Sequence, residues 1–308
     1  MEPNITNGIG QLMAGGLFDI NPGDLNTTGR VFIVCASTDT NFAEISSMYG
    51  AGYPDGKRIV HSTLALAIAA CLADRGDVIL IAPGHSETIT AAAGIAMATA
   101  GVRVVGLGSG TDRATINFTT STAATLTVTA QGCSFTNILF VVGIDALASM
   151  IVVSATDTTF QNCEFDTNNA TMGVVLGILT AATADRLVVN NCRFLGPAVN
   201  AGTTTTAQIQ YEAAVDIQIT NNYFTGKMTQ AVLNVTGTVL RGLIANNFFV
   251  IATGTKAIAV ASASTPFISN NRINVPSGTA PIVAAAGFVA GNVYSAAAGV
   301  TAGTASTI

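Results

Sequence analysis

The acidic side chains decide whether this chain could cleave a glycosidic bond, because that reaction needs two nearby carboxyl groups, one of them kept protonated. Asp157 and Asp216 recur at corresponding points of a repeat, where Arg186 and Arg241 alternate with them. A neighbouring guanidinium holds the pKa of a carboxyl group down, which suits a structural pair rather than a general acid. We therefore interpret Asp157, Arg186, Asp216 and Arg241 as an ionic ladder, and we predict no catalytic residue.

Other acids and one histidine give weaker signals. Glu164 is matched in the repeat with Arg193, so it is interpreted as a second ionic pair. His85 lies beside Ser86 and two residues before Glu87, but "GHS" lacks the G-x-S-x-G pattern of a nucleophile turn. We interpret His85 as a histidine in a surface turn.

The cysteines do not predict a metal site or a disulfide framework. Five are present, at positions 35, 71, 133, 163 and 192, without a CxxC pair or a cluster with histidine. We predict free buried thiols, no metal and no cofactor.

A repeat of 20 to 30 residues organises the chain beyond residue 130. Its anchor is a thiol or amide residue two positions before a large apolar one, and the anchors are Cys133, Cys163, Cys192, Asn222, Asn247, Asn271 and Asn292. Three positions before each anchor stands an apolar residue, in order Ala130, Phe160, Val189, Ile219, Ile244, Ile268 and Val289. A period of this length with one strand-like core per repeat is typical of a parallel β-solenoid.

Stacking of the coils explains why apolar residues, asparagine and cysteine recur at the repeated positions. Coils of a solenoid lie about 4.8 Å apart, so equivalent residues touch and apolar ones form inner columns. Stacked asparagines can pass amide hydrogen bonds from coil to coil, and the three cysteines are predicted to be small buried members of the same column. The fold class predicted from the repeat is all-β, a parallel β-solenoid, preceded by an irregular N-terminal arm.

The domain organisation follows from where the patterns begin and end. Residues 1–60 are predicted to be an arm and lead-in segment, although "RVFIVCAST" within them is β-rich. Residues 61–295 are the predicted β-helix, with an amphipathic helix over 63–75 that begins after Ser62 and ends at Gly76. Residues 296–308 form an Ala/Gly/Thr-rich tail.

The stretches "GDVILIAPG" and "VVGLGSG" and the repeated "NNxF" resemble the right-handed parallel β-helices of the pectate-lyase-like superfamily, over about residues 60–295. This resemblance implies an all-β fold, a right-handed parallel β-helix with an N-terminal capping α-helix, in which the helix over 63–75 caps the first coil. The run "YPDGKRIVHSTLALAIAACLADRGDVILIAPG" also resembles the opening of virion structural proteins of tailed bacteriophages. These motifs are specific for a fold and not for an activity.

Composition narrows the function further. The net charge is −5 and only 9% of residues are charged, so nucleic acid is not an expected partner, and no apolar run is long enough for a membrane partner. A surface this poor in charge favours cover by other copies, so we expect a homo-oligomer, specifically a trimer. The low charge, the absence of an acid dyad, the Gly/Asn-rich arm and the Ala/Gly/Thr-rich tail, together with the resemblance, predict a non-enzymatic capsid decoration (cement) protein bound to the major capsid protein, on the outside of the virion and made in the host cytoplasm. The alternative is a phage tailspike that acts on host surface polysaccharide.

Overall fold

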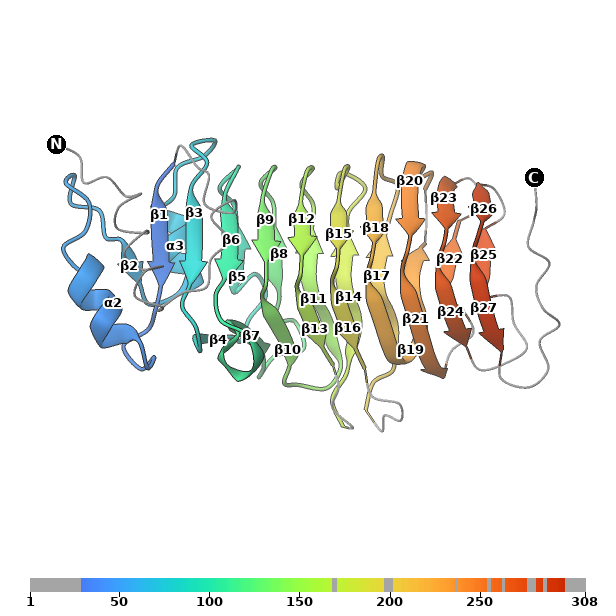
Figure 1. Cartoon of the computed structure of the whole chain (residues 1–308), viewed down its shortest axis with the longest axis horizontal. Coiled ribbons are helices and arrows are strands. Elements are labelled where there is room, and N and C mark those ends of the chain that lie inside the picture. Colours follow the sequence, from blue (N-terminus) through green and yellow to red (C-terminus); the bar gives the residue numbers. More distant parts are fainter. Residues whose placement is uncertain are drawn as a thin grey trace.

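The protein is a right-handed parallel β-helix, as the sequence predicts (Figure 1). The computed structural model describes residues 29–167, 171–196, 202–235, 237–253, 256–261, 264–275, 281–284 and 287–296. The predicted tail, apart from Ala296, and the first 28 residues of the predicted arm lie outside these ranges. All strand pairs within the described residues are parallel, so each face of the solenoid is a stack of coils.

The first face, called sheet A here, runs along the whole described length of the solenoid. Its strands, in spatial order, are β2 (Val60–His61), β1 (Val31–Val34), β3 (Val78–Ile81), β6 (Arg103–Gly106), β9 (Ser134–Thr136), β12 (Thr159–Gln161), β15 (Val188–Asn190), β18 (Gln218–Thr220), β20 (Leu240–Ala245), β23 (Thr265–Ser269) and β26 (Phe288–Ala290). The β-rich run inside the lead-in segment is therefore part of this sheet, because β1 pairs in parallel with β3.

The other two faces are joined by one long strand. Sheet B contains β4 (Ser86–Ile89), β7 (Thr115–Phe118), β10 (Leu139–Val142), β13 (Glu164–Asp166), β16 (Arg193–Leu195), β21 (Phe248–Thr253), β24 (Arg272–Val275) and β27 (Val293–Ala296). Sheet C contains β5 (Ile95–Met97), β8 (Leu126–Val128), β11 (Leu147–Val153), β14 (Val174–Thr180), β17 (Thr205–Tyr211), β22 (Ile258–Val260) and β25 (Ile282–Ala284). Strand β19 (Tyr223–Asn234) pairs with strands of both sheets.

Apolar columns fill the interior. In sheet A the register places Phe160, Val189, Ile219 and Ile244 side by side in successive coils, all of them buried. In sheet B a column of stacked phenylalanines, Phe165, Phe194 and Phe224, has ring centroids 4.5 and 4.6 Å apart. Stacked aromatic rings at strand spacing contribute packing beyond their burial, so these columns set the coil register.

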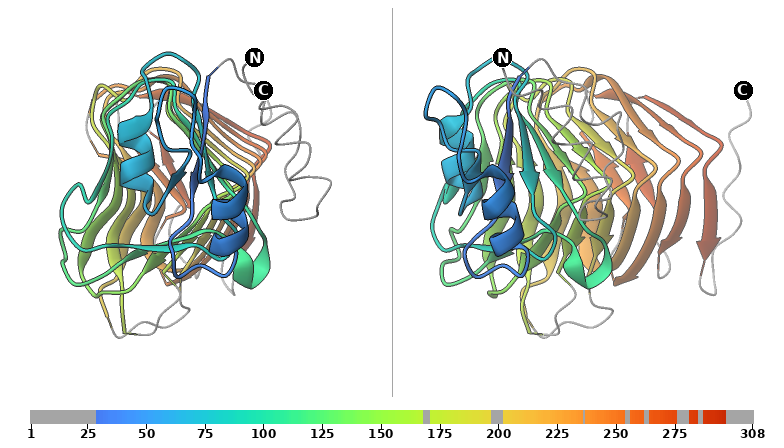
Figure 2. Two further views of the ribbon diagram at one scale, coloured as in Figure 1. Left: turned by 90° about the vertical axis from the view of Figure 1, so that its left-hand side faces the viewer. Right: turned by 60° about the vertical axis from the view of Figure 1, so that its left-hand side comes forward.

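Two short helices lie at the N-terminal end (Figures 1 and 2). Helix α3 (Leu64–Ala70) buries Leu64, Ala67 and Ile68 and contacts β5, so it covers the end of sheet C. Helix α2 (Phe42–Tyr49), which the sequence pattern did not predict, buries Ile45 against the outer side chains of β1, β3 and β6. A further short helical turn, 3-10 helix η2 (Gly110–Asp112), follows β6.

The capping helix is shorter than the predicted 63–75. Thr63, not Ser62, is its N-cap, and its hydroxyl accepts the N–H of Leu66. The helix ends at Ala70, and its C-cap residue, Cys71, has an extended backbone. The N–H of Leu72 donates to the carboxylate of Asp77 and so does not continue the helix.

The first anchor of the predicted repeat is also in the wrong register. Phe160 pairs with Phe135, not with a residue near Ala130, so the counterpart of Cys163 is Ile138 and not Cys133. The prediction was wrong here because Cys-x-Phe occurs five residues too early, at the start of β9, where Phe135 belongs to sheet A. From Cys163 onward the predicted register agrees with the strand pairing.

Candidate functional site

The repeated Asn-Asn pair forms the corner between sheets A and B. The first asparagine of each pair is left-handed, with φ between 55° and 59°, at Asn221, Asn246 and Asn270, and so is Asn191, which precedes Cys192, with φ 52°. Asparagine tolerates this conformation better than other residues with a side chain beyond Cβ, so it turns the chain sharply without glycine. The second asparagine then points inward and the following apolar residue enters sheet B.

The inward asparagines form a continuous hydrogen-bonded ladder. The Asn247 Nδ2 donates to Ile219 O at 2.9 Å and to Asn271 Oδ1 at 3.0 Å, while its Oδ1 accepts from Asn222 N and Nδ2. Asn222 and Asn271 repeat this pattern, and Asn292 Nδ2 donates to Ile268 O. The buried amides of Asn222, Asn247 and Asn271 are thus paired on both sides.

Two of the three predicted cysteines occupy the same column. The thiols of Cys163 and Cys192 donate to Phe135 O and Phe160 O in the preceding coil, which is the bond that the asparagine amides make later in the chain. Cys133 lies elsewhere and donates to Thr99 O. All five cysteines are free, and Cys71 is the one that is not fully buried.

The ionic ladder lies on the corner that leads into sheet A. Arg186 donates to both carboxylate oxygens of Asp157 at 2.5 and 2.6 Å, and Arg241 donates to both of Asp216 at 2.8 Å. All four residues have φ between 55° and 59°, and their side chains are between 37% and 67% exposed. The guanidinium groups hold the pKa of Asp157 and Asp216 below the usual value.

A second ionic group lines a groove beside the asparagine corner. Glu164 Oε2 accepts from Arg113 at 3.2 Å and from Arg193 at 3.1 Å, and Arg113 also donates to Asn162 O. The groove, of about 370 Å³, is lined by Ser109, Gly110, Arg113, Asn137, Asn162, Cys163, Asn191 and Arg193. The pairing of Glu164 with Arg193 agrees with the sequence prediction, whereas Arg113 was not foreseen because it lies 51 residues away.

Aromatic side chains continue the line of Arg193 on the outer side of sheet B. Strand pairing places Arg193, Tyr223, Phe248 and Arg272 in four successive coils. The rings of Tyr223 and Phe248 stack, with centroids 5.6 Å apart, and Phe248 is 43% exposed. The row therefore presents two flat rings between two guanidinium groups.

His85 is buried rather than exposed in a surface turn. Its Nδ1 lies 2.6 Å from Asp39 Oδ2, and its Nε2 lies 3.7 Å from Glu87 Oε2. Asp39 also accepts from Ala36 N, and Glu87 accepts from Leu64 N at the start of α3. Burial lowers the pKa of His85, but the two carboxylates outweigh it and raise the pKa overall. Asp39 was missed because it comes from a loop 46 residues away.

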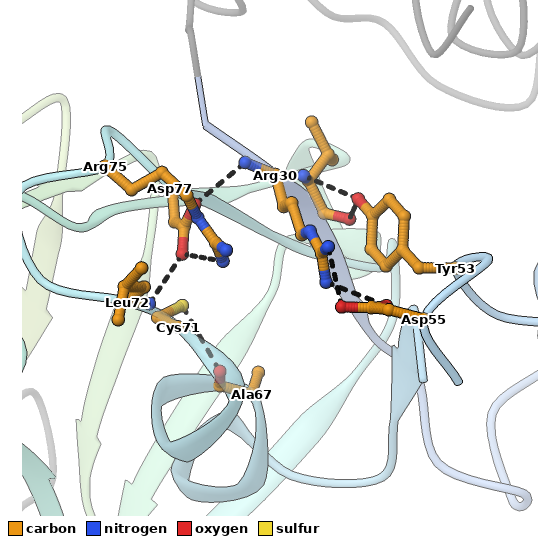
Figure 3. A network of polar contacts seen from close by, with 9 residues as sticks. Arg30, Tyr53, Asp55, Ala67, Cys71, Leu72, Arg75 and Asp77 are labelled. Atoms are coloured by element: carbon orange, nitrogen blue, oxygen red, sulfur yellow. Dashed lines mark hydrogen bonds and ion pairs between the residues drawn. The ribbon is translucent and has the colours of Figure 1, made fainter. Parts of the chain in front are cut away.

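Asp77 organises the N-terminal end around one buried carboxylate (Figure 3). It accepts from Arg30 N, from Leu72 N and, at 2.6 Å to each oxygen, from the Arg75 guanidinium. Burial opposes its charge, but these donors prevail and lower its pKa. Nearby, Arg30 pairs with Asp55, and its guanidinium lies 4.5 Å from the Tyr53 ring.

The chemistry available to these groups is limited. Where the pKa of a carboxyl group departs from its usual value, at Asp55, Asp77, Asp145, Asp157 and Asp216, the shift is downward. Such carboxylates accept hydrogen bonds and do not deliver protons near neutral pH. Among the described residues, no group of three or more His, Cys, Asp or Glu side chains could hold a metal ion. The helices described here are all too short or too polar to cross a membrane.

Comparison with known proteins does not identify a family. The chain matches no family model, no curated protein and no solved structure. The parallel β-solenoid fold therefore rests on the strand pairing itself.

Proposed function

We propose that this chain is a non-enzymatic structural protein of a tailed-bacteriophage virion, a decoration protein on the outside of the capsid that binds the major capsid protein as a homo-oligomer. The observation that carries the proposal is the mutual engagement of charged groups along the stacked coils. Asp157, Glu164 and Asp216 each accept from an arginine, and the described chain is a stiff ladder rather than a cleft with a free acid pair.

Stiffness is what such a protein needs. Each coil is hydrogen-bonded along its length to the next, and the buried amides add a second set of bonds between coils. A solenoid of this kind presents long, regular faces, and long faces suit repeated contacts with a symmetric shell and with other copies. The resemblance of residues 53–84 to the opening of phage virion proteins is the sequence support for this assignment.

The test is the location of the protein in virions. Antibodies raised against the full chain, applied to purified virions of the source phage and viewed by electron microscopy, should label heads at many positions. Label confined to the tail, or no label on virions that contain all other structural proteins, would overturn the proposal.

The second candidate function is a tailspike that binds acidic polysaccharide, and the row of Arg193, Tyr223, Phe248 and Arg272 favours it. Flat rings can stack on sugar faces, and guanidinium groups pair with carboxylates. Arg193 and Arg272 are three coils apart, about 14 Å, whereas a nucleic acid strand carries a charge every 3.4 Å or so. The row therefore fits a sparsely charged chain better than nucleic acid.

Binding of an acidic oligosaccharide separates the two candidates. Titration of fragments of an acidic polysaccharide with one carboxylate per several sugars, such as gellan, into the full chain should give no heat under the decoration hypothesis. Saturable binding that is lost in Phe248→Ser, and kept in the control Leu66→Ser, would favour the tailspike. Leu66 is 53% exposed on α3, away from the row, so the control removes a comparable exposed apolar group.

A further inference from the structure

We infer that the outer face of sheet A from β9 to β26 packs against a second copy of this chain. The face consists of the two residues that flank each buried inward residue: Ser134, Thr136, Thr159, Gln161, Val188, Asn190, Gln218, Thr220, Leu243, Ala245, Phe267, Ser269, Phe288 and Ala290. None of them is ionisable. We call this strip the uncharged face.

The N-terminal part of the same sheet shows what covers such a surface. Over β1 and β3 the outer positions are apolar, as is Val105 of β6, and helix α2 buries them with Ile45, Phe42 and Tyr49. No described element covers the sheet beyond β9, yet its last coils are again apolar. Phe267 is 52% exposed and Phe288 39%, their rings lie 5.7 Å apart, and Leu243 precedes them in the same column. Exposed aromatic pairs of this kind mark interaction surfaces.

Charge indicates a copy of the same chain as the occupant. When equivalent faces meet around a symmetry axis, like charges oppose each other and weaken association. This strip has no charge to oppose. One of its borders is the corner where Asp157 and Asp216 are neutralised by arginines, and the other is the corner of uncharged asparagines. A strongly charged partner would find no complementary group on the strip.

The length of the strip suits the centre of an interface. Seven strands at about 4.8 Å spacing give a length of about 29 Å, and three residues per strand give a width of about 10 Å. A standard interface buries about 800 Å² per partner, so the contact also includes the two bordering corners, on one of which arginines neutralise Asp157 and Asp216. This inference rests on the proposed function in one respect, which is the expectation that the protein is a homo-oligomer, specifically a trimer.

The experiment measures the mass of the full chain in solution by light scattering and sedimentation. Wild type should form a discrete oligomer. Gln161→Lys with Gln218→Lys places new charges at two exposed positions on the strip and should raise the dissociation constant at least about tenfold. Thr88→Lys with Thr229→Lys, exposed positions on β4 and β19, is the matched control and should leave the mass unchanged.

A second variant tests the apolar end of the strip. Phe267→Ser with Phe288→Ser removes two exposed rings, so it should weaken association while the circular dichroism of the chain stays that of wild type. A monomeric wild type, or a lysine variant that keeps the wild-type mass, would overturn the inference. That result would leave virion labelling unaffected, so the failure of this inference is distinguishable from failure of the proposed function.

Discussion

At the scale of single residues, the two asparagines of each Asn-Asn pair have different roles: the first turns the chain and the second makes buried hydrogen bonds between coils. Asn246 adopts the left-handed conformation and remains exposed, whereas Asn247 is buried and bonded to both neighbouring coils. The hydrogen bond from the buried residue to a carbonyl of the preceding coil needs a donor, and the thiols of Cys163 and Cys192 supply it in earlier coils. Only the amide also accepts, so the ladder is complete only from Asn222 onward.

Replacing Asn247 by alanine should destabilise the protein by about 3 kcal/mol, because the N–H of Asn222 and the carbonyl of Ile219 lose a buried partner. Chemical denaturation measures this. Asn246→Gly, at the neighbouring exposed position, should change stability by no more than about 0.5 kcal/mol. Equal losses in the two variants would show that the ladder contributes nothing particular.

The inner column of sheet A gives a sharper residue-level prediction. Ile219 is fully buried between Val189 and Ile244, so Ile219→Asp buries a charge without a partner and should prevent folding. Gln218→Asp, one residue earlier and exposed, is the matched control and should remain folded. Circular dichroism and solubility distinguish the two, and a soluble Ile219→Asp variant with a wild-type melting curve would contradict the assigned register.

Sequence reasoning worked for these columns because stacking makes each position repeat. Ile219 and Asn247 are predictable from spacing alone, since every coil from Cys163 onward obeys the same pattern. The prediction for Cys133 failed because residue type was used without register, and Ile138, the true counterpart of Cys163 in the preceding coil, has neither a thiol nor an amide. Contacts of Asp39 with His85 and of Arg113 with Glu164 do not repeat, so no spacing could reveal them.

At the scale of elements, His85 links three parts of the N-terminal end. Asp39 precedes α2, Glu87 holds the first N–H of α3, and His85 itself follows β3. Cys35 also lies beside Asp39, and burial and the Asp39 carboxylate raise the pKa of its thiol to about 12, so this thiol stays neutral while the histidine titrates. When it is protonated, His85 can therefore pair with the carboxylate that precedes α2 and with the carboxylate at the start of α3, and so tie both helices to the first coils.

The sign of the pH dependence follows from the raised pKa of His85. Its contribution to stability is fully present below its unfolded pKa, about 6.5, and is lost as the pH rises through the higher folded value. Hydrogen exchange of residues 36–49 should therefore become faster, beyond the intrinsic effect of pH, as the pH rises from about 6 to 9. His85→Gln should remove this excess dependence, and an unchanged pH profile in that variant would exclude His85 as the fastening group.

Asp77 gives the opposite dependence at the same end of the molecule. Its pKa is lowered, so its contribution is present above the unfolded value of about 3.9 and is lost as the pH falls through the folded one. Asp77→Asn should cost about 3 kcal/mol at neutral pH, because the buried Arg75 contact loses its charge partner. Asp55→Asn, at the more exposed pair with Arg30, is the control and should cost far less in the same thermal unfolding experiment.

At the scale of the whole molecule, the charge is divided along the rod. All 17 acidic residues lie at or before Asp216, and the chain beyond it contains Lys227, Arg241, Lys256 and Arg272 with no acid. The uncharged face runs from the acidic part of the rod into the basic part, and it contains no ionisable residue in either part. Association through that face with parallel axes would place like regions side by side, so salt that screens their repulsion should strengthen the oligomer.

The solenoid is quasi-one-dimensional, so one coil should be removable as a unit. Deleting residues 222–246 joins Asn221 directly to Asn247, which restores the Asn-Asn pair and keeps both ladder and inner columns in register. We expect this variant to fold cooperatively and to be shorter by about 4.8 Å in small-angle scattering. Deleting residues 222–234 instead removes β19 and its ladder asparagine without a replacement, so it should not fold. If both deletions fold equally well, then coil register does not control this structure; if neither folds, the coils are not interchangeable units and the one-dimensional account of its stability is wrong.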